Sequence, residues 1–384
     1  MRIGIDARFV THPQRGGFKT YTENLIAALA QVDHQNEYVL YLDRPPQPQT
    51  TLPEWPNFST RIVPGKLPLL GMVWREQIGL GRQVAQDRLD VFHSPCLTAP
   101  LNLACRSVVT IHDMIWHSPG KFSRGNTWSA QRQLMETYYR LIPQLAVRRA
   151  SAIIAVSHAA KLDLVEQLKV DANRVFVTHE AAKECFRQID DQVQISLACD
   201  KYQLPPQFIL AIGSADPRKN IKTLAQAYAS LPAELQAVYP LVIVWTHSFL
   251  ADELTSHIEL LGLMDRVHFL EHVPDEDLVL LYNAAALFAF PSLYEGFGLP
   301  LLEAMACGTP IIAANNSSIP EVTGEAALLV GAQDASTLTN LMIQALTDQA
   351  LRSALIRKGL ERAAGFSWND CARQTIAAYE SGRA

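Results

Sequence analysis

The sequence predicts an α/β protein built from two doubly wound domains, each with a parallel sheet and helices on both faces. Short runs rich in Val, Ile and Leu alternate along the chain with longer segments of helical pattern. These runs lack the apolar-polar alternation of a half-exposed strand, which is typical of parallel strands covered on both faces. The length of 384 residues also exceeds what one core usually holds, so two domains are expected.

Twelve segments have the pattern of a buried strand, six in each half of the chain. Their alternation with helices is typical of doubly wound sheets. A polar and then proline-bearing segment at 190–208 separates the halves, so we expect domains at 1–195 and 200–369, and a surface loop at the proline-rich segment 44–56. The expected strands are 2–7, 38–42, 90–94, 107–113, 152–157, 174–179, 208–214, 240–246, 267–273, 286–292, 310–315 and 326–331.

Several of these strands end in a polar or titratable residue. Ligands of open α/β sheets bind beyond the carboxyl ends of the strands. Each domain is therefore expected to present a polar rim, and two rims that face each other would form a cleft. The residues at the strand ends are Asp6, His112, Ser157, Ser214, Thr246, Ser292 and Asn315.

The composition is that of an ordinary globular protein, with 48% apolar and 18% charged residues. The net charge of −5 gives no reason to expect a nucleic acid partner. The first ten residues carry Arg2, Asp6 and Arg8, so no signal peptide is expected, and no apolar run approaches the roughly 18 residues of a membrane span. Six cysteines without a CxxC pair favour buried thiols and a cytoplasmic location.

Two carboxylates flank a glycine turn in the segment EGFGLPLLEAMACG. Glu295 precedes the turn, and Glu303 follows it in a helix predicted over 300–306. Pro300 suits the first helical position, and Gly308 is a typical C-terminal glycine. Glu303, placed in the first turn, would by itself only complement the helix dipole, a contribution of roughly 0.3–1 kcal/mol. The free N–H groups of such a helix start also form an anion site suited to a diphosphate.

The segment EGFGLPLLEAMACGTPIIA resembles the E-x7-E signature of the retaining GT-B glycosyltransferases of family 4, also called glycosyl transferases group 1. The resemblance extends over nearly the whole chain and implies a GT-B fold, with two Rossmann-like domains that face each other across a cleft. It implies that Glu295 is catalytic and faces the donor sugar, and that Glu303 binds the ribose hydroxyls of the nucleotide. It also implies that the intervening backbone approaches the sugar and the phosphates, at Gly296, Phe297, Gly298 and Leu299.

The segment FILAIGSADPRKNIKTLAQAY resembles the strand and loop that open the nucleotide domain of this family. Lys219 matches the lysine that binds the donor diphosphate, and Arg218 beside it is expected to supply a second positive charge. Ser214 stands where many members have an arginine, and is expected in the cleft. The alternative for Arg218 and Lys219 is a pair of solvated surface charges.

The first half also resembles this family. In QRGGFKTYTENL, Gly16 and Gly17 match a glycine loop that approaches the donor phosphates. His112 followed by Asp113 matches an element whose histidine contacts the reacting sugar, although a lone histidine is more often structural. The match at 152–164 makes Ser157 a pocket residue.

Further matches concern the base and the terminal helix. The segment VHFLEHVPDEDL resembles the one whose backbone, here near Val273, holds the nucleotide base, and the end of the chain resembles a helix, at about 370–384, that packs back on the first domain. Two departures lie near the cleft: Trp245 replaces a usual glycine, and residues 179–182 replace the common N-G-V-D. Both are expected to alter donor or acceptor selection.

Together these features predict a retaining hexosyltransferase that uses a nucleotide sugar and needs neither a metal nor another cofactor. The resemblance implies front-face attack, as proposed for the family, and the sequence offers no acid that we would assign as the nucleophile of a double displacement. The segments DPRKN and IHDMI resemble those of family members that transfer mannose from GDP-mannose. This resemblance implies GDP-mannose as the donor, with UDP-glucose or a related UDP-sugar next. The alternatives are an epimerase or phosphorylase acting on sugar phosphates, a non-catalytic nucleotide-sugar-binding protein, and an NAD-dependent dehydrogenase, which lacks its G-x-G-x-x-G motif here.

The acceptor is expected to be a saccharide or a lipid-linked sugar, in surface polysaccharide or glycolipid synthesis. In the segment 121–150, six basic residues stand against one acid, Glu136, with apolar and aromatic residues interleaved. Such a stretch can rest on an anionic membrane at its cytoplasmic face and meet a lipid-linked acceptor. The alternative is a solvated helix packed on its own domain. The basic residues are Lys121, Arg124, Arg132, Arg140, Arg148 and Arg149, and the interleaved residues are Trp128, Leu134, Met135, Tyr138, Tyr139, Leu141 and Ile142.

Overall fold

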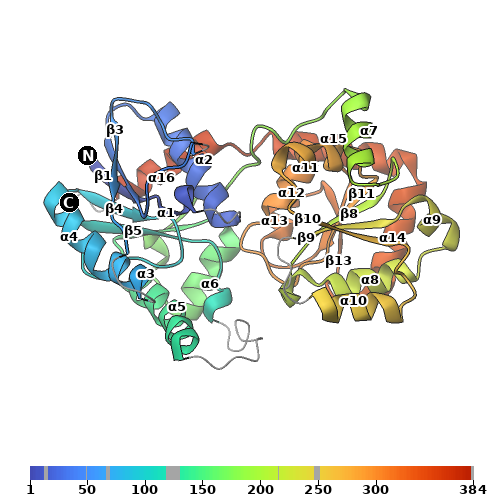
Figure 1. Ribbon diagram of the computed structural model, residues 1–384, viewed down its shortest axis with the longest axis horizontal. Coiled ribbons are helices and arrows are strands. Elements are labelled where there is room, and N and C mark those ends of the chain that lie inside the picture. Colours follow the sequence, from blue (N-terminus) through green and yellow to red (C-terminus); the bar gives the residue numbers. More distant parts are fainter. Residues whose placement is uncertain are drawn as a thin grey trace. The chain divides into compact units, whose positions relative to one another are not determined.

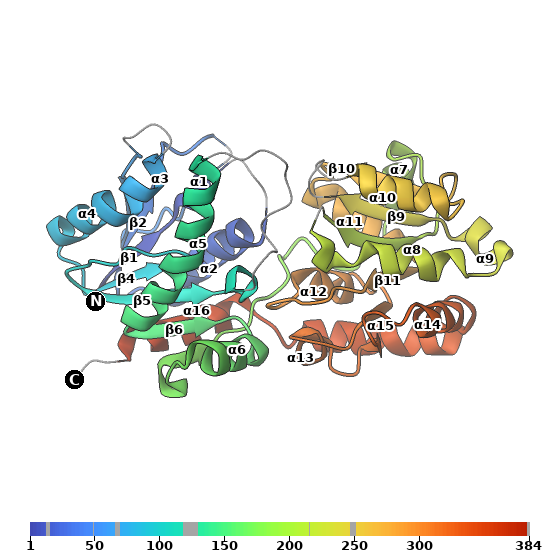
Figure 2. The same cartoon turned by 90° about the horizontal axis from the view of Figure 1, so that it is seen from below.

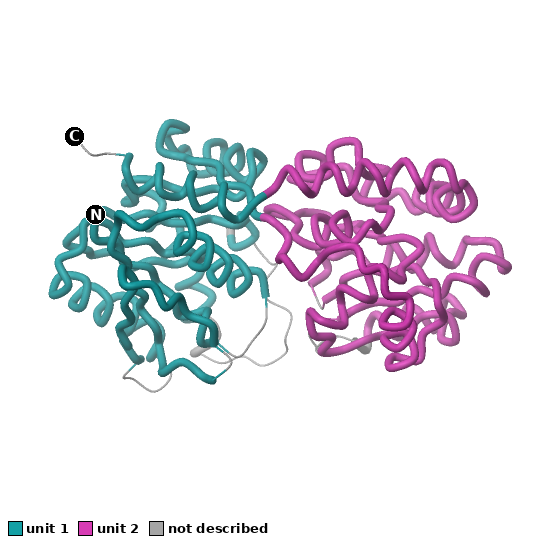
Figure 3. Tube along the Cα trace, turned by 90° about the horizontal axis from the view of Figure 1, so that it is seen from above, with its two compact units in different colours: residues 1–180, 367–384 teal, residues 181–366 magenta. Residues whose placement is uncertain are grey.

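A computed structural model describes residues 1–381, apart from 13–15, 49, 66–69, 118–129, 215 and 246–250. The chain forms two compact units (Figure 3). Unit 1 comprises residues 1–180 and 367–384, and unit 2 comprises residues 181–366.

Unit 1 contains a seven-stranded parallel sheet with the order β3-β2-β1-β4-β5-β6-β7. Most of its strands are short runs of buried apolar residues, as predicted, and the chain reverses its direction of winding between β1 and β4. The strands are β1 Arg2–Asp6, β2 Glu37–Leu42, β3 Phe58–Ile62, β4 Val91–Ser94, β5 Arg106–Ile111, β6 Ala152–Ala155 and β7 Val175–Val177.

Helices cover both faces of this sheet (Figures 1 and 2). α2 and α16 pack against each other on one face, and α4, α5 and α6 lie on the other, where they bury Val84, Val147 and Leu164 against the strands. The helices are α1 Arg8–Thr11, α2 Gly17–Val32, α3 Gly71–Trp74, a π-helix Arg75–Gly79, α4 Leu80–Asp87, α5 Ala130–Arg149, α6 His158–Leu168 and α16 Trp368–Glu380, with short 3₁₀ helices at Ile115–His117 and Ala172–Arg174.

Unit 2 contains a six-stranded parallel sheet with the order β10-β9-β8-β11-β12-β13. Here the winding reverses between β8 and β11, so the unit is doubly wound, as predicted. The strands are β8 Ile209–Gly213, β9 Leu241–Trp245, β10 Val267–Glu271, β11 Leu287–Phe290, β12 Ile311–Ala314 and β13 Ala327–Val330.

The sheet of unit 2 also lies between two helical layers (Figure 1). α8, α10 and α14 cover one face and share a core with β8, β9 and β11, and α11, α12 and α15 cover the other face. The helices are α7 Gln192–Lys201, a 3₁₀ helix Pro217–Lys219, α8 Ile221–Ala229, α9 Ala233–Val238, α10 Ala251–Leu260, α11 Asp275–Ala284, α12 Leu299–Ala306, α13 Ile319–Thr323, α14 Ala335–Thr347 and α15 Gln349–Ala363.

The boundary between the units lies after residue 180, earlier than the predicted boundary at 195–200. The segment that follows belongs to unit 2 because it is tied to α11. Lys183 Nζ lies 2.7 Å from a carboxylate oxygen of Asp275, and the Ile189 N–H donates to Asn283 Oδ1 at 2.8 Å. α7 packs on the same helix. The chain returns to unit 1 just before α16, which lies against α2.

Each of the twelve predicted strands overlaps an observed one, and the sheet of unit 1 has one strand more. This additional strand, β3, follows the predicted loop 44–56 and forms the edge of the sheet. The three central residues of its sequence FSTRI are polar, and all five residues are half-exposed or exposed, so it lacks the apolar run by which the other strands were predicted. Among the described residues, no helix is both long and apolar enough to span a membrane.

Candidate functional site

The reversal of winding between β8 and β11 marks the place in unit 2 where a ligand is expected. Adjacent loops lead away from the sheet in opposite directions at such a point and leave a crevice beyond the carboxyl ends of the strands. The loop after β8 carries Arg218 and Lys219, and the loop after β11 carries Glu295. Three predicted site residues therefore come from the two loops that flank this point.

These three side chains form a cluster of ion pairs. Glu295 Oε1 lies 2.7 Å from Lys219 Nζ, and Glu295 Oε2 lies 2.7 Å from Arg218 Nη1. Arg218 also donates to the carbonyl of Tyr294 at 2.7 Å, and its Nε lies 3.1 Å from a carboxylate oxygen of Asp216. Burial by itself raises the pKa of Glu295, but the charges of Lys219 and Arg218 outweigh it and hold that pKa below its usual value. The carboxylate is therefore ionised at neutral pH.

The loop after β8 has a defined local structure that presents its two cations. Asp216 caps the 3₁₀ helix by accepting from the Arg218 N–H at 2.9 Å. Asn220, the residue after this 3₁₀ helix, has a left-handed backbone (φ 56°), which asparagine tolerates better than most residues. Its Nδ2 donates to the carbonyls of Pro291 at 2.9 Å and Ala332 at 2.6 Å, which ties the ends of three strands together. Ser214, also predicted here, accepts from the Asp216 N–H at 3.2 Å.

The glycine turn between the two acids is fixed by residues that follow β12. Gly298 has a φ of 107°, where a side chain would be strained, and α12 begins directly after it. Ser318 is fully buried, and its Oγ donates to the carbonyls of Glu295 at 3.0 Å and Phe297 at 2.8 Å. Ser317 Oγ accepts from the Glu295 N–H at 3.0 Å.

Sequence reasoning missed Ser317 and Ser318. Their signal was a run of small polar residues, NNSS, directly after β12. Such a run is equally typical of an ordinary turn. The two serines hydrogen-bond the N–H and the carbonyl of Glu295, so we regard them as positioning residues of the loop.

Glu303 lies in a different place on α12 from the one predicted. It is the fifth residue of the helix, in the second turn, and the first turn holds no acid. The helix dipole acts mainly on the first turn, so this correction weakens the explanation that Glu303 only complements the dipole. Its carboxylate accepts a hydrogen bond from Tyr282 at 3.1 Å. Burial, with a smaller effect from Asp275, raises the pKa of Glu303 to about 7.

His112, at the carboxyl end of β5 in unit 1, is held at both ring nitrogens. Nε2 lies 3.1 Å from the carbonyl oxygen of Pro95, and Nδ1 lies 3.1 Å from Glu180 Oε1. A carbonyl oxygen only accepts, so Nε2 carries a proton. Burial by itself lowers the pKa of His112, but the hydrogen bond and the charge of Glu180 outweigh it and raise that pKa. The ion pair with Glu180 therefore favours the protonated form of the His112 ring.

Glu180 lies in the segment that departs from the common N-G-V-D, and it was not predicted as a site residue. The ring of His112 is also enclosed by aromatic edges, with centroid distances of 4.6 Å to Tyr21 and 5.0 Å to Phe18. Phe18 directly follows the predicted Gly16 and Gly17, so the structure brings the glycine turn and His112 together in unit 1. A Cβ atom at either glycine would have open space around it.

The remaining predicted residues have local structural roles. Ser157 is fully buried and caps α6, with its Oγ accepting from the Ala160 N–H at 2.9 Å. The Asp113 carboxylate accepts from the Ile115 N–H at 3.1 Å, at the start of the 3₁₀ helix. Val273 is buried in the loop after β10. Thr246, a predicted strand end, lies outside the described residues.

The point of reversal in unit 1, between β1 and β4, holds a buried polar cluster, of which sequence reasoning had identified only Asp6 as a polar strand end. Arg75 Nη2 lies 2.8 Å from Asp6 Oδ1, and Arg8 Nη1 lies 2.6 Å from Glu76 Oε2. The cluster contains two positive and two negative side chains, all nearly inaccessible to solvent. Tyr138 on α5 donates to the carboxylate of Glu76 and so anchors that helix to the cluster.

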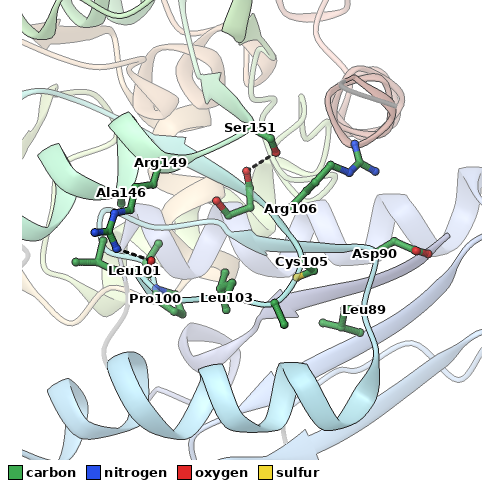
Figure 4. A pocket seen from close by; sticks show the side chains of 13 residues that line it. Leu89, Asp90, Pro100, Leu101, Leu103, Cys105, Arg106, Ala146, Arg149 and Ser151 are labelled. Carbon is green, nitrogen blue, oxygen red and sulfur yellow. Dashed lines mark hydrogen bonds between the residues drawn. The ribbon is translucent and has the colours of Figure 1, made fainter. Parts of the chain in front are cut away.

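A hollow of about 620 Å³ lies elsewhere in unit 1 (Figure 4). Its lining includes Arg106 and Ser107 at the start of β5 and Ser151 just before β6. These are the amino ends of the strands, opposite the edge where ligands of such sheets bind. The guanidinium groups of Arg106 and Arg149 already donate to backbone carbonyls there. We therefore do not assign the donor site to this hollow.

Comparisons with known proteins point to one family. The model of Glycosyl transferases group 1 matches residues 201–362, and the model of Glycosyltransferase Family 4 matches residues 15–181. The chain is 34% identical to O-antigen chain mannosyltransferase B of Escherichia coli over 292 residues, which cover 76% of this chain and 74% of that protein.

Solved structures show the same fold. A sucrose-phosphate synthase from Thermosynechococcus elongatus superposes with a TM-score of 0.74 at 23% identity, over 98% of both chains. The Anabaena protein HepE, solved in complex with UDP-glucose, superposes with a TM-score of 0.73 at 21% identity, over 99% of both chains. At these identities the likeness establishes the fold, which is GT-B with two Rossmann-like domains, as predicted.

Proposed function

Because the chain belongs to the family 4, or group 1, glycosyltransferases, we propose that it moves a hexose from a nucleotide sugar to a saccharide or lipid-linked acceptor, with retention at the anomeric carbon. The observation that carries this proposal is the cluster of Arg218, Lys219 and Glu295 at the point of reversal in unit 2. It combines two cations for a diphosphate with a carboxylate that can accept from sugar hydroxyls.

In this proposal, different residues of unit 2 bind different parts of the donor. Lys219 and Arg218 neutralise the charge that grows on the leaving diphosphate, together with the N–H groups at the start of α12. Glu303 accepts from the ribose hydroxyls, and the backbone near Val273 holds the base. Two observations support this assignment: Glu295 is paired with both cations, and α12 begins shortly after Glu295, directly after the glycine turn.

Transfer by front-face attack follows from the carboxylates available. A double displacement needs a free carboxylate close to the anomeric carbon. Glu295 is already paired with two cations, so it is a poor nucleophile. In front-face attack the departing phosphate accepts the proton of the acceptor hydroxyl.

In unit 1 we propose that His112, fixed by Glu180 and Pro95, contacts the reacting sugar.

We propose GDP-mannose as the donor and UDP-glucose as the second choice. The similarity to an O-antigen mannosyltransferase supports mannose and a role in surface polysaccharide synthesis. Because two side-chain cations face the diphosphate, we propose that transfer needs no metal and no other cofactor.

Ligand-dependent unfolding tests the donor assignment. The purified protein is heated with GDP, UDP, ADP and their sugar conjugates in the presence of EDTA. A ligand at 100 times its Kd raises the free energy of unfolding by about 2.7 kcal/mol. We expect stabilisation by guanine nucleotides, lost in Glu303→Ala and kept in Glu361→Ala, which removes an exposed carboxylate of α15. No stabilisation by any nucleotide would contradict the transferase proposal and favour a sugar-phosphate enzyme.

We propose further that α5 rests on an anionic membrane, where a lipid-linked acceptor would lie. Leu134, Leu141 and Leu145 are 50%, 50% and 37% exposed and fall on one stripe of the helix. Exposed arginines at 148 and 149 lie beside this stripe, and exposed Arg140 lies further round the helix. An exposed apolar stripe with flanking cations is typical of helices that lie in the membrane interface. Residues 121–129 of the predicted basic stretch lie outside the described residues.

Sedimentation with lipid vesicles tests this contact. We expect binding to vesicles that contain phosphatidylserine, weaker binding to neutral vesicles, and a loss of binding in Leu141→Asp. The matched control is Leu197→Asp, which places a charge at a 62% exposed leucine of α7. Equal binding of both variants would favour the alternative of a solvated helix.

A further inference from the structure

We propose that Glu295 makes the donor site bind the intact nucleotide sugar in preference to the nucleoside diphosphate, an inference that rests on the proposed function. The Glu295 carboxylate would compete with the diphosphate for Arg218 and Lys219. Glu295 would then be a specificity-determining residue that weakens product binding as well as a contact for the sugar.

The geometry shows how fully the carboxylate is engaged. Each oxygen of Glu295 lies 2.7 Å from a different cation, which is the short distance of a charge-assisted hydrogen bond. The side chains of Glu295, Lys219 and Arg218 are only 10%, 14% and 15% exposed. The Glu295 carboxylate is therefore an anionic partner of both cations, and an anionic ligand of these cations would compete with it.

The charges of the cluster cancel. Arg218 and Lys219 are positive, whereas Glu295 and the Arg218-bound Asp216 are negative. A diphosphate therefore meets a neutral group of side chains, and it can attract the cations only by weakening their bonds to Glu295. Coulomb interactions are strong where solvent is largely excluded, and a buried charge that loses its partners is costly.

The backbone keeps Glu295 within reach of the cations. Its N–H donates to Ser317 Oγ, and its carbonyl accepts from the buried Ser318. The carboxylate therefore cannot avoid the competition by a movement of its loop unless these bonds also break.

The two ligands differ in what they offer the displaced carboxylate. A nucleotide sugar brings hydroxyl donors next to the diphosphate, and these can replace the lost partners of Glu295. A nucleoside diphosphate brings the same phosphates without the sugar hydroxyls, so the Glu295 carboxylate loses its cation partners and gains no hydrogen-bond donors in return. After transfer, Glu295 would regain the cations and favour release of the nucleotide product.

The test compares the affinities of both ligands in matched variants. Calorimetric titration measures GDP and GDP-mannose, and UDP and UDP-glucose in parallel, against the wild type, Glu295→Gln and Asp216→Asn. In Glu295→Gln we expect the diphosphate to bind about 5- to 50-fold more tightly and the nucleotide sugar to bind equally or more weakly. Asp216→Asn also removes a negative partner of Arg218, so both affinities should change in the same direction and keep their ratio.

Two further measurements separate competition from a merely structural effect. In a Lys219→Gln background, the gain in diphosphate affinity from Glu295→Gln should shrink, because one of the contested cations is absent. In steady-state assays, the inhibition constant of the diphosphate should fall in Glu295→Gln. If that variant does not fold, Glu295→Ala serves for the same titrations with the same expected direction.

The outcomes also separate this inference from the proposed function. If the wild type binds neither diphosphates nor nucleotide sugars, the proposed function fails. If the wild type binds both, and a folded Glu295→Gln or Glu295→Ala binds the diphosphate no more tightly than the wild type does, the competition proposed here is overturned and the donor site stands.

Discussion

Glu295 and Glu303 carry the same carboxyl group, but their environments shift its pKa in opposite directions. Glu295 faces two cations, which hold its pKa below the usual value. Burial, with a smaller effect from Asp275, outweighs the hydrogen bond from Tyr282 and raises the pKa of Glu303 to about 7. A carboxylate that accepts from ribose hydroxyls must be ionised to offer all its lone pairs. Nucleotide affinity is therefore expected to fall below about pH 7, where Glu303 takes up a proton.

Glu303→Gln should stabilise the protein and weaken nucleotide binding. Because the folded-state pKa of Glu303 is raised, its favourable contribution is present at low pH and is lost as the pH rises through about 7. The free energy of unfolding should therefore rise in the variant by about 1–3 kcal/mol at pH 8 and by less at pH 5. Denaturant unfolding at both values measures this, with Glu361→Gln as an exposed control. A variant that loses stability at pH 8 would contradict the expected environment of Glu303.

Glu180→Gln should lower the pKa of His112. The raised pKa means that this pair stabilises the folded state below the ordinary histidine pKa, and that the contribution is lost as the pH rises through the folded-state value. Without the Glu180 charge, burial is no longer outweighed, and the His112 resonance in an NMR titration should shift to lower pH. Glu166→Gln, an exposed change on α6, should leave it in place. His93, also near His112, is already neutral because burial lowers its pKa to about 3.

At the scale of the elements, the site depends on how α12 begins. The helix starts after Gly298, whose φ of 107° is open to glycine and strained for other residues. Its position is then fixed by Ser318, which follows the neighbouring strand β12. The helix that we propose to contact the diphosphate is therefore positioned both by a tight turn and by the pairing of β12 with its neighbour.

Gly298→Ala should lower both stability and donor affinity. A new Cβ atom would lie 3.0 Å from Leu301 Cδ1 in a strained backbone, at a cost of about 1–3 kcal/mol. The matched control is Gly308→Ala, at the other end of α12, which also has a left-handed φ of 73° and meets the flexible amide of Gln188. Thermal unfolding and nucleotide titration should show a loss of stability in both variants and a loss of affinity only in Gly298→Ala. A loss of affinity in both would assign the effect to the helix as a whole.

At the scale of the whole molecule, the last helix belongs to the first unit. α16 buries Tyr379 in unit 1, where the hydroxyl of Tyr379 lies 2.7 Å from His93 Nδ1, and Arg106 donates to the carbonyls of Tyr379 and Ser381. The two units have separate cores, so unfolding need not be a single two-state step.

A chain that ends at residue 366 should lose stability in unit 1 alone. Removal of α16 exposes the faces of α2 and β6 that it covers, and each large apolar side chain exposed costs about 1.5–3 kcal/mol. Calorimetry should show one lowered transition and a second that nucleotide still shifts upward. Tyr379→Phe, which leaves His93 Nδ1 without this partner, should cost about 1–3 kcal/mol in the same transition. A single transition that nucleotide no longer shifts would contradict the independence of unit 2.

The sequence by itself determined the two doubly wound units and twelve of their strands, because apolar runs and glycine turns are local properties of the chain. Its resemblance to a known family gave the candidate site residues, which are Glu295, Glu303, Arg218, Lys219 and His112. The sequence did not reveal β3, whose edge position permits polar residues, or the boundary at residue 180, which long-range contacts to α11 set. Only the tertiary structure decided that Glu295 is paired with cations 76 and 77 residues away and that His112 is held by Glu180. These pairings depend on which strands lie side by side, and no local pattern in the sequence encodes that order.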